Sequence, residues 1–84
     1  MSGDTAIIVL KIPKRSVIAD LEIPLDISAN ELVFALNMAY DLGIDTANIK
    51  DCYLKAENPI ALLKGNKTLS EFGLRNGSVI NYTE

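Results

Sequence analysis

The clearest helix signal in this chain lies between two groups of strand-like runs, and this order strongly restricts the possible fold. Residues 28–31, Ser-Ala-Asn-Glu, form a capping box, in which the Ser28 hydroxyl accepts from the third helical N–H and Glu31 reaches back to the cap. Gly43 is a typical left-handed stop, so we expect the helix to end there. At about 100° per residue, the predicted apolar stripe comprises Ala29, Leu32, Leu36, Ala39 and Tyr40.

Within this stripe we expect Leu32 and Leu36 to anchor the helix to a sheet. The small side chains of Ala35 and Ala39 beside them would allow a close approach.

Two strand-like runs precede the helix, at residues 5–12 and 17–25, with a hairpin connection at residues 13–16. The second run alternates apolar and polar residues, so one of its faces is predicted to be buried. In the first run the charged Lys11 indicates which face of the strand is exposed to solvent. The residues expected to point inward are Ile8, Leu10, Ile12, Ala19, Leu21, Ile23 and Leu25, while Ile7 and Val9 are expected to point outward.

Three further strands are predicted after the helix, at residues 49–56, 60–63 and 78–83, with turns at residues 57–59 and 65–66. The 84 residues suffice for a single domain, residues 1–84. The order of elements predicts an α+β fold, with a mixed four- to five-stranded sheet and one helix packed on one face.

The end of the chain, residues 67–82, carries a recognisable motif. Leu69 and Phe72 are three residues apart, as one helical turn needs to point both inward, and Asn76-Gly77 supplies the chemistry of a tight turn. This segment resembles the end of ubiquitin-like domains, which implies a ubiquitin-like β-grasp. Ubiquitin and related sulfur carriers act through a Gly-Gly tail, whereas this chain ends at Glu84. We therefore expect the fold without conjugation.

Among ubiquitin-like proteins the chain is most similar to the YukD and EsaB proteins of type VII secretion systems in low-GC Gram-positive bacteria. The resemblance extends from Ile7 to Tyr82 and is strongest in Ala19-Asp20-Leu21-Glu22-Ile23-Pro24 and at residues 69–78. It implies a non-enzymatic, cytoplasmic accessory or regulatory component of the machinery that WXG-type substrates use. Docking to a membrane-embedded or ATPase subunit is also implied, but no site residues are.

Two alternatives stay open at this point. One is a ubiquitin-like modifier or sulfur carrier whose Gly-Gly tail is missing, and the other is the N-terminal cytoplasmic domain of a larger secretion membrane protein.

Composition argues against several other functions. The net charge of −3 disfavours nucleic-acid binding, so protein partners are expected. There is no histidine, and no nucleophile or carboxylate lies at catalytic or metal-binding spacing, so we expect no catalytic residue, cofactor or metal. Cys52 is predicted to be an inert buried thiol. No signal peptide or membrane-spanning run is found, which favours a cytoplasmic location without membrane insertion.

Two apolar surfaces are the candidate partner sites. Tyr53 is predicted to lie on the open sheet face with Ile7 and Val9, and tyrosine is a favoured interface anchor. Phe34 and Met38 are four residues apart on the predicted wet side of the helix. The alternatives are ordinary cross-strand packing for the first set and covering loops for the second.

A cluster of positive charge, Lys11, Lys14 and Arg15, surrounds the first hairpin. A solvated loop tip is the favoured interpretation, because isolated surface charges contribute little, with partner docking as the alternative.

Overall fold

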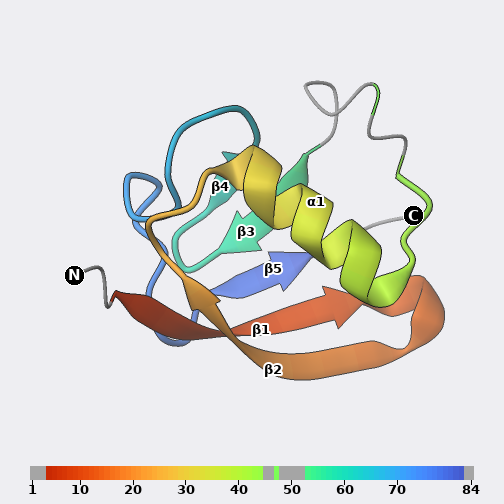
Figure 1. The fold of residues 1–84 in the computed structure, drawn as a ribbon. Coiled ribbons are helices and arrows are strands. Elements are labelled where there is room, and N and C mark those ends of the chain that lie inside the picture. The colour runs from red at the N-terminus through yellow and green to blue at the C-terminus, as the bar shows by residue number, and fades with distance from the viewer. Residues whose placement is uncertain (1–3, 45–46, 48–52, 83–84) are drawn as a thin grey trace.

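The computed structural model describes residues 4–44, 47 and 53–82, and all structural statements below refer to these residues. Two long strands come first, then one helix, then three short strands, in the predicted order (Figure 1). The elements are β1 (Thr5–Ile12), the 3-10 turn η1 (Pro13–Arg15), β2 (Val17–Pro24), α1 (Ala29–Tyr40), β3 (Leu54–Glu57), β4 (Ala61–Leu63) and β5 (Val79–Asn81).

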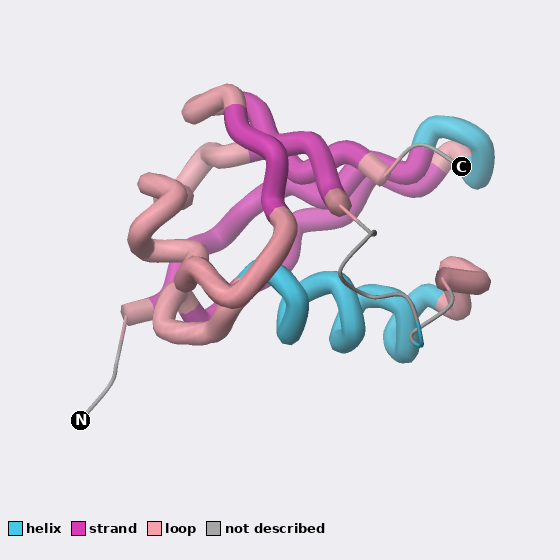
Figure 2. The backbone as a smooth tube through the Cα atoms, turned by 90° about the horizontal axis from the view of Figure 1, so that it is seen from above, coloured by secondary structure: helices cyan, strands magenta, loops and turns pink. Residues whose placement is uncertain are grey.

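The five strands form one mixed sheet in the order β2-β1-β5-β3-β4. Only the central pair, β1 and β5, is parallel, and the other three pairs are antiparallel. The helix runs along one side of the sheet, so the opposite face of the sheet carries no helix (Figures 1 and 2). The predicted α+β class is confirmed. No described helix is long and apolar enough to cross a bilayer.

The core lies between the helix and the covered face of the sheet. Ile8, Leu10 and Ile12 of β1 are completely buried, as predicted, because alternate residues of a strand share one face. Leu54, Leu63 and Ile80 of the other strands and Leu69 of the following turn extend this layer, and the buried residues of α1 pack against it. Of the four positions predicted to be buried in the second run, only Ile23 is buried, because β2 is an edge strand. Ala19 and Leu21 of β2, and Leu25 just after it, are only partly covered.

The helix begins as predicted. Ser28 Oγ accepts from the Glu31 N–H at 3.1 Å, and Glu31 Oε1 accepts from the Ser28 N–H at 3.2 Å, which completes the capping box. The predicted stripe needs correction, because it left out Val33, which is buried, and included Ala39, which is exposed. Ala35, expected to lie close to the sheet beside the stripe, is also exposed. Val33 lies about 40° to one side of Ala29 around the helix, while Ala39 lies about 80° to the other side. The buried arc is therefore centred closer to Val33 than the stripe assumed.

The helix ends two residues before the predicted position. Asp41, not Gly43, is the left-handed residue at the C-terminal cap, with φ 52°. The guanidinium of Arg15 donates to the carbonyl oxygens of Tyr40 at 2.7 Å and Asp41 at 3.0 Å. These carbonyls have no partner within the helix, and a cation is favourable at the negative end of the helix dipole. Arg15 thus has a structural role beyond that of a solvated loop tip.

The strands after the helix are shorter than predicted. Residues 48–52, including Cys52 and the start of the predicted 49–56 strand, lie outside the described residues, and β3 begins at Leu54. The final strand begins after Ser78, whose Oγ instead bonds to the backbone of Asn58 and Arg75. The predicted turn at residues 76–77 is present, with Gly77 at φ 91° and a hydrogen bond from the Ser78 N–H to the Arg75 carbonyl oxygen at 3.0 Å.

The turn predicted around Leu69 and Phe72 is present, and it carries Leu69 into the core but leaves Phe72 only half-buried against it. Glu71 holds this turn, because one of its carboxylate oxygens accepts from both the N–H (3.1 Å) and the hydroxyl (3.0 Å) of Thr68. The backbone hydrogen bond from Thr68, followed by the bond from its hydroxyl and the charge of Lys67, lowers the pKa of Glu71, although slight desolvation opposes the shift.

This lowered pKa predicts a pH-dependent contribution to stability. A carboxylate with a depressed folded pKa stabilises above its unfolded pKa, near about 4.3, and loses this contribution as the pH falls through the folded pKa. Glu71→Gln should therefore lower the melting temperature at neutral pH, and the difference from the parent protein should shrink in acid. Asp20→Asn removes the same charge from a carboxylate without a hydrogen-bond partner in the described structure, and controls for net charge. Melting curves of Glu71→Gln and the parent with a constant offset at every pH would contradict the prediction.

Candidate protein interface

The described part of the protein exposes seven large apolar side chains, and they fall on two faces. Five belong to the sheet side or its loops, and two belong to the helix. The exposed fraction is 91% for Ile60, 73% for Ile18 and 70% for Met38, and it is close to half for Ile7, Phe34, Tyr53 and Leu62.

The strand register aligns five outward side chains in one row across the open face. Each member pairs with the next on the neighbouring strand, and paired residues in a sheet point to the same side. We call this set the lysine row: Leu62 (β4), Lys55 (β3), Asn81 (β5), Lys11 (β1) and Ile18 (β2). The row is apolar at both edges of the sheet and carries two ammonium groups between them.

A second row lies beside the first and has the reverse polarity. We call it the acidic row: Glu57 (β3), Val79 (β5), Val9 (β1) and Asp20 (β2). Its two valines are half-buried neighbours at the centre of the face, and carboxylates occupy its ends. The open face therefore has a banded distribution of charge and apolar surface.

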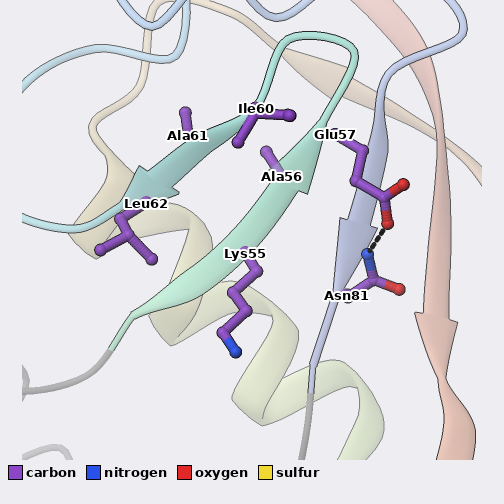
Figure 3. A pocket seen from close by; sticks show the side chains of 7 residues that line it. All are labelled: Lys55, Ala56, Glu57, Ile60, Ala61, Leu62 and Asn81. Atoms are coloured by element: carbon purple, nitrogen blue, oxygen red, sulfur yellow. Dashed lines mark hydrogen bonds between the residues drawn. The ribbon is translucent and has the colours of Figure 1, made fainter.

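One end of the lysine row opens into a surface groove of about 540 Å³ (Figure 3). Its lining includes the aliphatic side chains of Ile60 and Leu62 and the outward side chain of Lys55. On the β5 side the Asn81 amide donates to Glu57 Oε2 at 2.6 Å, so the Glu57 carboxylate already has a partner within the protein.

The predicted sheet patch is exposed but not contiguous. Tyr53 and Ile7 are half-exposed, and Val9 is half-buried beside Val79. Tyr53 lies two residues before Lys55, beyond the lysine row, whereas Ile7 lies two residues before Val9, beyond the acidic row. At roughly 3.3 Å per residue, about 20 Å separates Tyr53 from Ile7 along the strands. The fold does not bring these two together, and binding by any of the three residues stays a prediction.

The predicted helix patch is exposed. Phe34 and Met38 lie one turn apart, on the side of α1 away from the buried Leu32 and Leu36. Their role in binding is likewise still a prediction.

Sequence reasoning missed three of the exposed residues, Ile18, Ile60 and Leu62. The sequence gives no clear signal for Leu62, because all four residues at 60–63 are apolar and alternation alone does not assign either face of this strand to the core. Leu62 pairs with Lys55 on consecutive strands, and so does Ile18 with Lys11. The alignment of these two pairs in one row depends on the pairing of β5 with β1 and with β3, which are distant in the sequence, and has no local signal.

No group of three or more acidic, cysteine or histidine side chains converges among residues 4–44, 47 and 53–82. Within the same ranges, every buried side-chain nitrogen or oxygen atom has a hydrogen-bond partner.

Several solved structures with similar folds are ubiquitin-like domains. The C-terminal ubiquitin-like domain of mouse tubulin-specific chaperone e is 14% identical, covers 99% of this chain and 89% of its own, and gives a TM-score of 0.75. The N-terminal ubiquitin-like domain of tubulin-binding cofactor B from Drosophila melanogaster is 10% identical, with coverages of 98% and 86% and a TM-score of 0.68. At such identities the likeness shows the fold alone.

No curated protein matches the chain. The model of the family described as WXG100 protein secretion system (Wss), protein YukD, matches residues 7–81. This range includes the whole helix and all five strands, apart from the first two residues of β1. The chain thus combines a ubiquitin-like fold with a family match over most of its length, and it belongs to the family of the WXG100 secretion-system protein YukD.

Proposed function

We propose that this protein is a non-enzymatic, non-conjugated interaction module and acts as a cytoplasmic accessory or regulatory component of a WXG100 secretion system. Membership of the YukD family supports the link to secretion. The proposed partners are protein components of the same machinery.

The observation that carries the proposal is the amount of apolar surface that the core does not use. Tyr53, Ile7, Phe34 and Met38 are exposed although the space between sheet and helix is already filled by fully buried aliphatic residues. Phe34 and Met38 are neighbours one turn apart on α1, and a protein surface rarely keeps adjacent large apolar groups in water without a partner to cover them. Tyrosine and methionine are also enriched at protein interfaces.

Substitution of Tyr53 tests this function. Tyr53→Ala should keep a native circular dichroism spectrum, because the side chain lies outside the core, and should weaken co-purification of secretion components from the native host by about tenfold. Secretion of a WXG-type substrate into the medium should fall in the same strain. Lys14→Ala, at an exposed site in η1, is the matched control and should leave both measurements unchanged.

The helix patch is tested by Phe34→Ala with Met38→Ala in the same assays. Loss of partner only in the helix variant would place the interface on α1. The proposed function would be contradicted by a variant that carries Tyr53→Ala, Phe34→Ala and Met38→Ala together, folds, supports normal substrate secretion and still co-purifies with secretion components.

A further inference from the structure

The lysine row presents positive charge that has no partner among the described residues. No hydrogen bond or ion pair involves the ammonium of Lys11 or Lys55 within the described structure, although the chain carries a net charge of −3. The residue between them, Asn81, uses its amide to hold Glu57. Two free cations therefore stand on the open face, with an exposed aliphatic residue beyond each of them, Leu62 and Ile18.

The spacing of the row is that of a helix laid across the strands. Neighbouring strands lie about 4.8 Å apart, and helical residues three or four apart are separated by about 4.5 to 6 Å along the axis. Lys55 and Lys11 are two strand spacings apart, about 9.6 Å, and helical residues seven apart are separated by about 10.5 Å on one face. An extended peptide repeats on one face only every 6.6 Å or so and loses this match.

We propose that the lysine row binds an acidic amphipathic helix of a protein partner, with the helix axis across the strands. This inference rests on the proposed function and names the partner chemistry for the open face. Two carboxylates about seven residues apart bind Lys55 and Lys11. An apolar side chain at one end enters the groove beside Ile60 and Leu62, and an apolar side chain at the other end covers Ile18.

The acidic row determines where the helix lies. A partner shifted by one row toward β1's start would place its carboxylates near Glu57 and Asp20, and like charges at an interface are strongly unfavourable. The half-buried pair Val9 and Val79, between these carboxylates, instead offers an apolar surface beside the helix. The two rows together thus select position as well as charge.

An anionic membrane is a weaker candidate for this surface. Each basic residue near an anionic bilayer contributes only about 1 kcal/mol, and stable binding by charge alone uses clusters of about four to eight. The lysine row supplies two, and Glu57 and Asp20 next to it would oppose the membrane charge.

The test uses a synthetic helical peptide with the complementary pattern. Its leucines lie near the two ends, and its two glutamates lie about seven positions apart on the same face of the helix as the leucines. The control is an isomer of identical composition that carries the glutamates on the opposite face. Binding is measured by fluorescence anisotropy and mapped by amide chemical shifts. We expect binding of the first peptide only, with shifts at Lys11, Ile18, Lys55 and Leu62, and a decrease in affinity with added salt.

Charge reversal then tests the contacts. K11E with K55E should lower the affinity for the glutamate peptide by about tenfold or more. A peptide with lysines in place of the glutamates should bind this double variant more tightly than the parent protein. K14E reverses the charge of an exposed lysine outside the row and should change the affinity for the peptide by less than about twofold. Circular dichroism verifies that both variants fold.

The inference is overturned if the charge reversals inside and outside the row weaken peptide binding equally, or if the isomer binds as tightly as the first peptide. It is also overturned if the amide chemical shift changes are confined to α1, or if the first peptide does not bind. Binding to phosphatidylserine vesicles that K11E with K55E abolishes, without peptide binding, would assign the row to a membrane instead. If Tyr53→Ala stops secretion while the peptide fails to bind, the proposed function stands and only the helical partner is refuted.

Discussion

Leu36→Ala is expected to lower the free energy of unfolding by about 2 to 5 kcal/mol. Leu36 is only 5% exposed and belongs to the buried cluster that joins α1 to the covered face of the sheet. Truncation removes the transfer free energy of its methyl groups and leaves a cavity that the surrounding strands fill only in part. At about 0.05 to 0.15 kcal/mol per residue, a chain of 84 residues has little stability to spare.

Urea denaturation at neutral pH measures this effect, and the same helix provides a matched control. Met38→Ala shortens a side chain of similar size that is 70% exposed, so its cost should stay within about 0.5 kcal/mol. Both changes introduce alanine into α1, so helix propensity does not account for a difference between them. Equal destabilisation by the two variants would show that Leu36 does not anchor the core.

Local patterns in the sequence determine much of this fold. The capping box required only residues 28–31, and the inward positions of β1 followed from alternation around Lys11. The end of the helix was harder to predict from the sequence, because the carbonyls of Tyr40 and Asp41 are bound by Arg15, which is 25 residues or more away in the sequence. The error at Val33 and Ala39 has a different cause: the breadth of a helix's buried face depends on which strands lie below it.

The candidate surfaces likewise include features that local sequence predicts and features that depend on contacts between distant residues. The exposure of Phe34 and Met38 could be predicted because it depends only on the phase of one helix. The separation of Tyr53 from Ile7 could not, since it requires the pairing of β1 with β5 and of β5 with β3. The lysine row takes one residue from each of the five strands, and its two hairpin pairs are joined only through Asn81 of β5.

Ser78→Ala is expected to cost about 1 to 3 kcal/mol, a large effect for the loss of one oxygen atom. Ser78 is completely buried, and its hydroxyl joins two loops. Its Oγ donates to the carbonyl oxygen of Asn58 at 2.7 Å and accepts from the N–H of Arg75 at 3.0 Å. Alanine fits the same space but leaves both of these backbone groups without a partner.

Ser70→Ala is the control, because Ser70 is an exposed serine in the neighbouring turn and its hydroxyl has no hydrogen bond in the described structure. We expect a change within about 0.5 kcal/mol for Ser70→Ala. In Ser78→Ala, amide hydrogen exchange should accelerate most at Arg75, which loses its acceptor. Arg75 also donates from its guanidinium to Asn58 Oδ1 at 2.9 Å, so the two loops keep one contact and the variant should still fold. Equal stability of the two variants would refute a role for the Ser78 hydroxyl, and an unchanged exchange rate at Arg75 would mean that water replaces it.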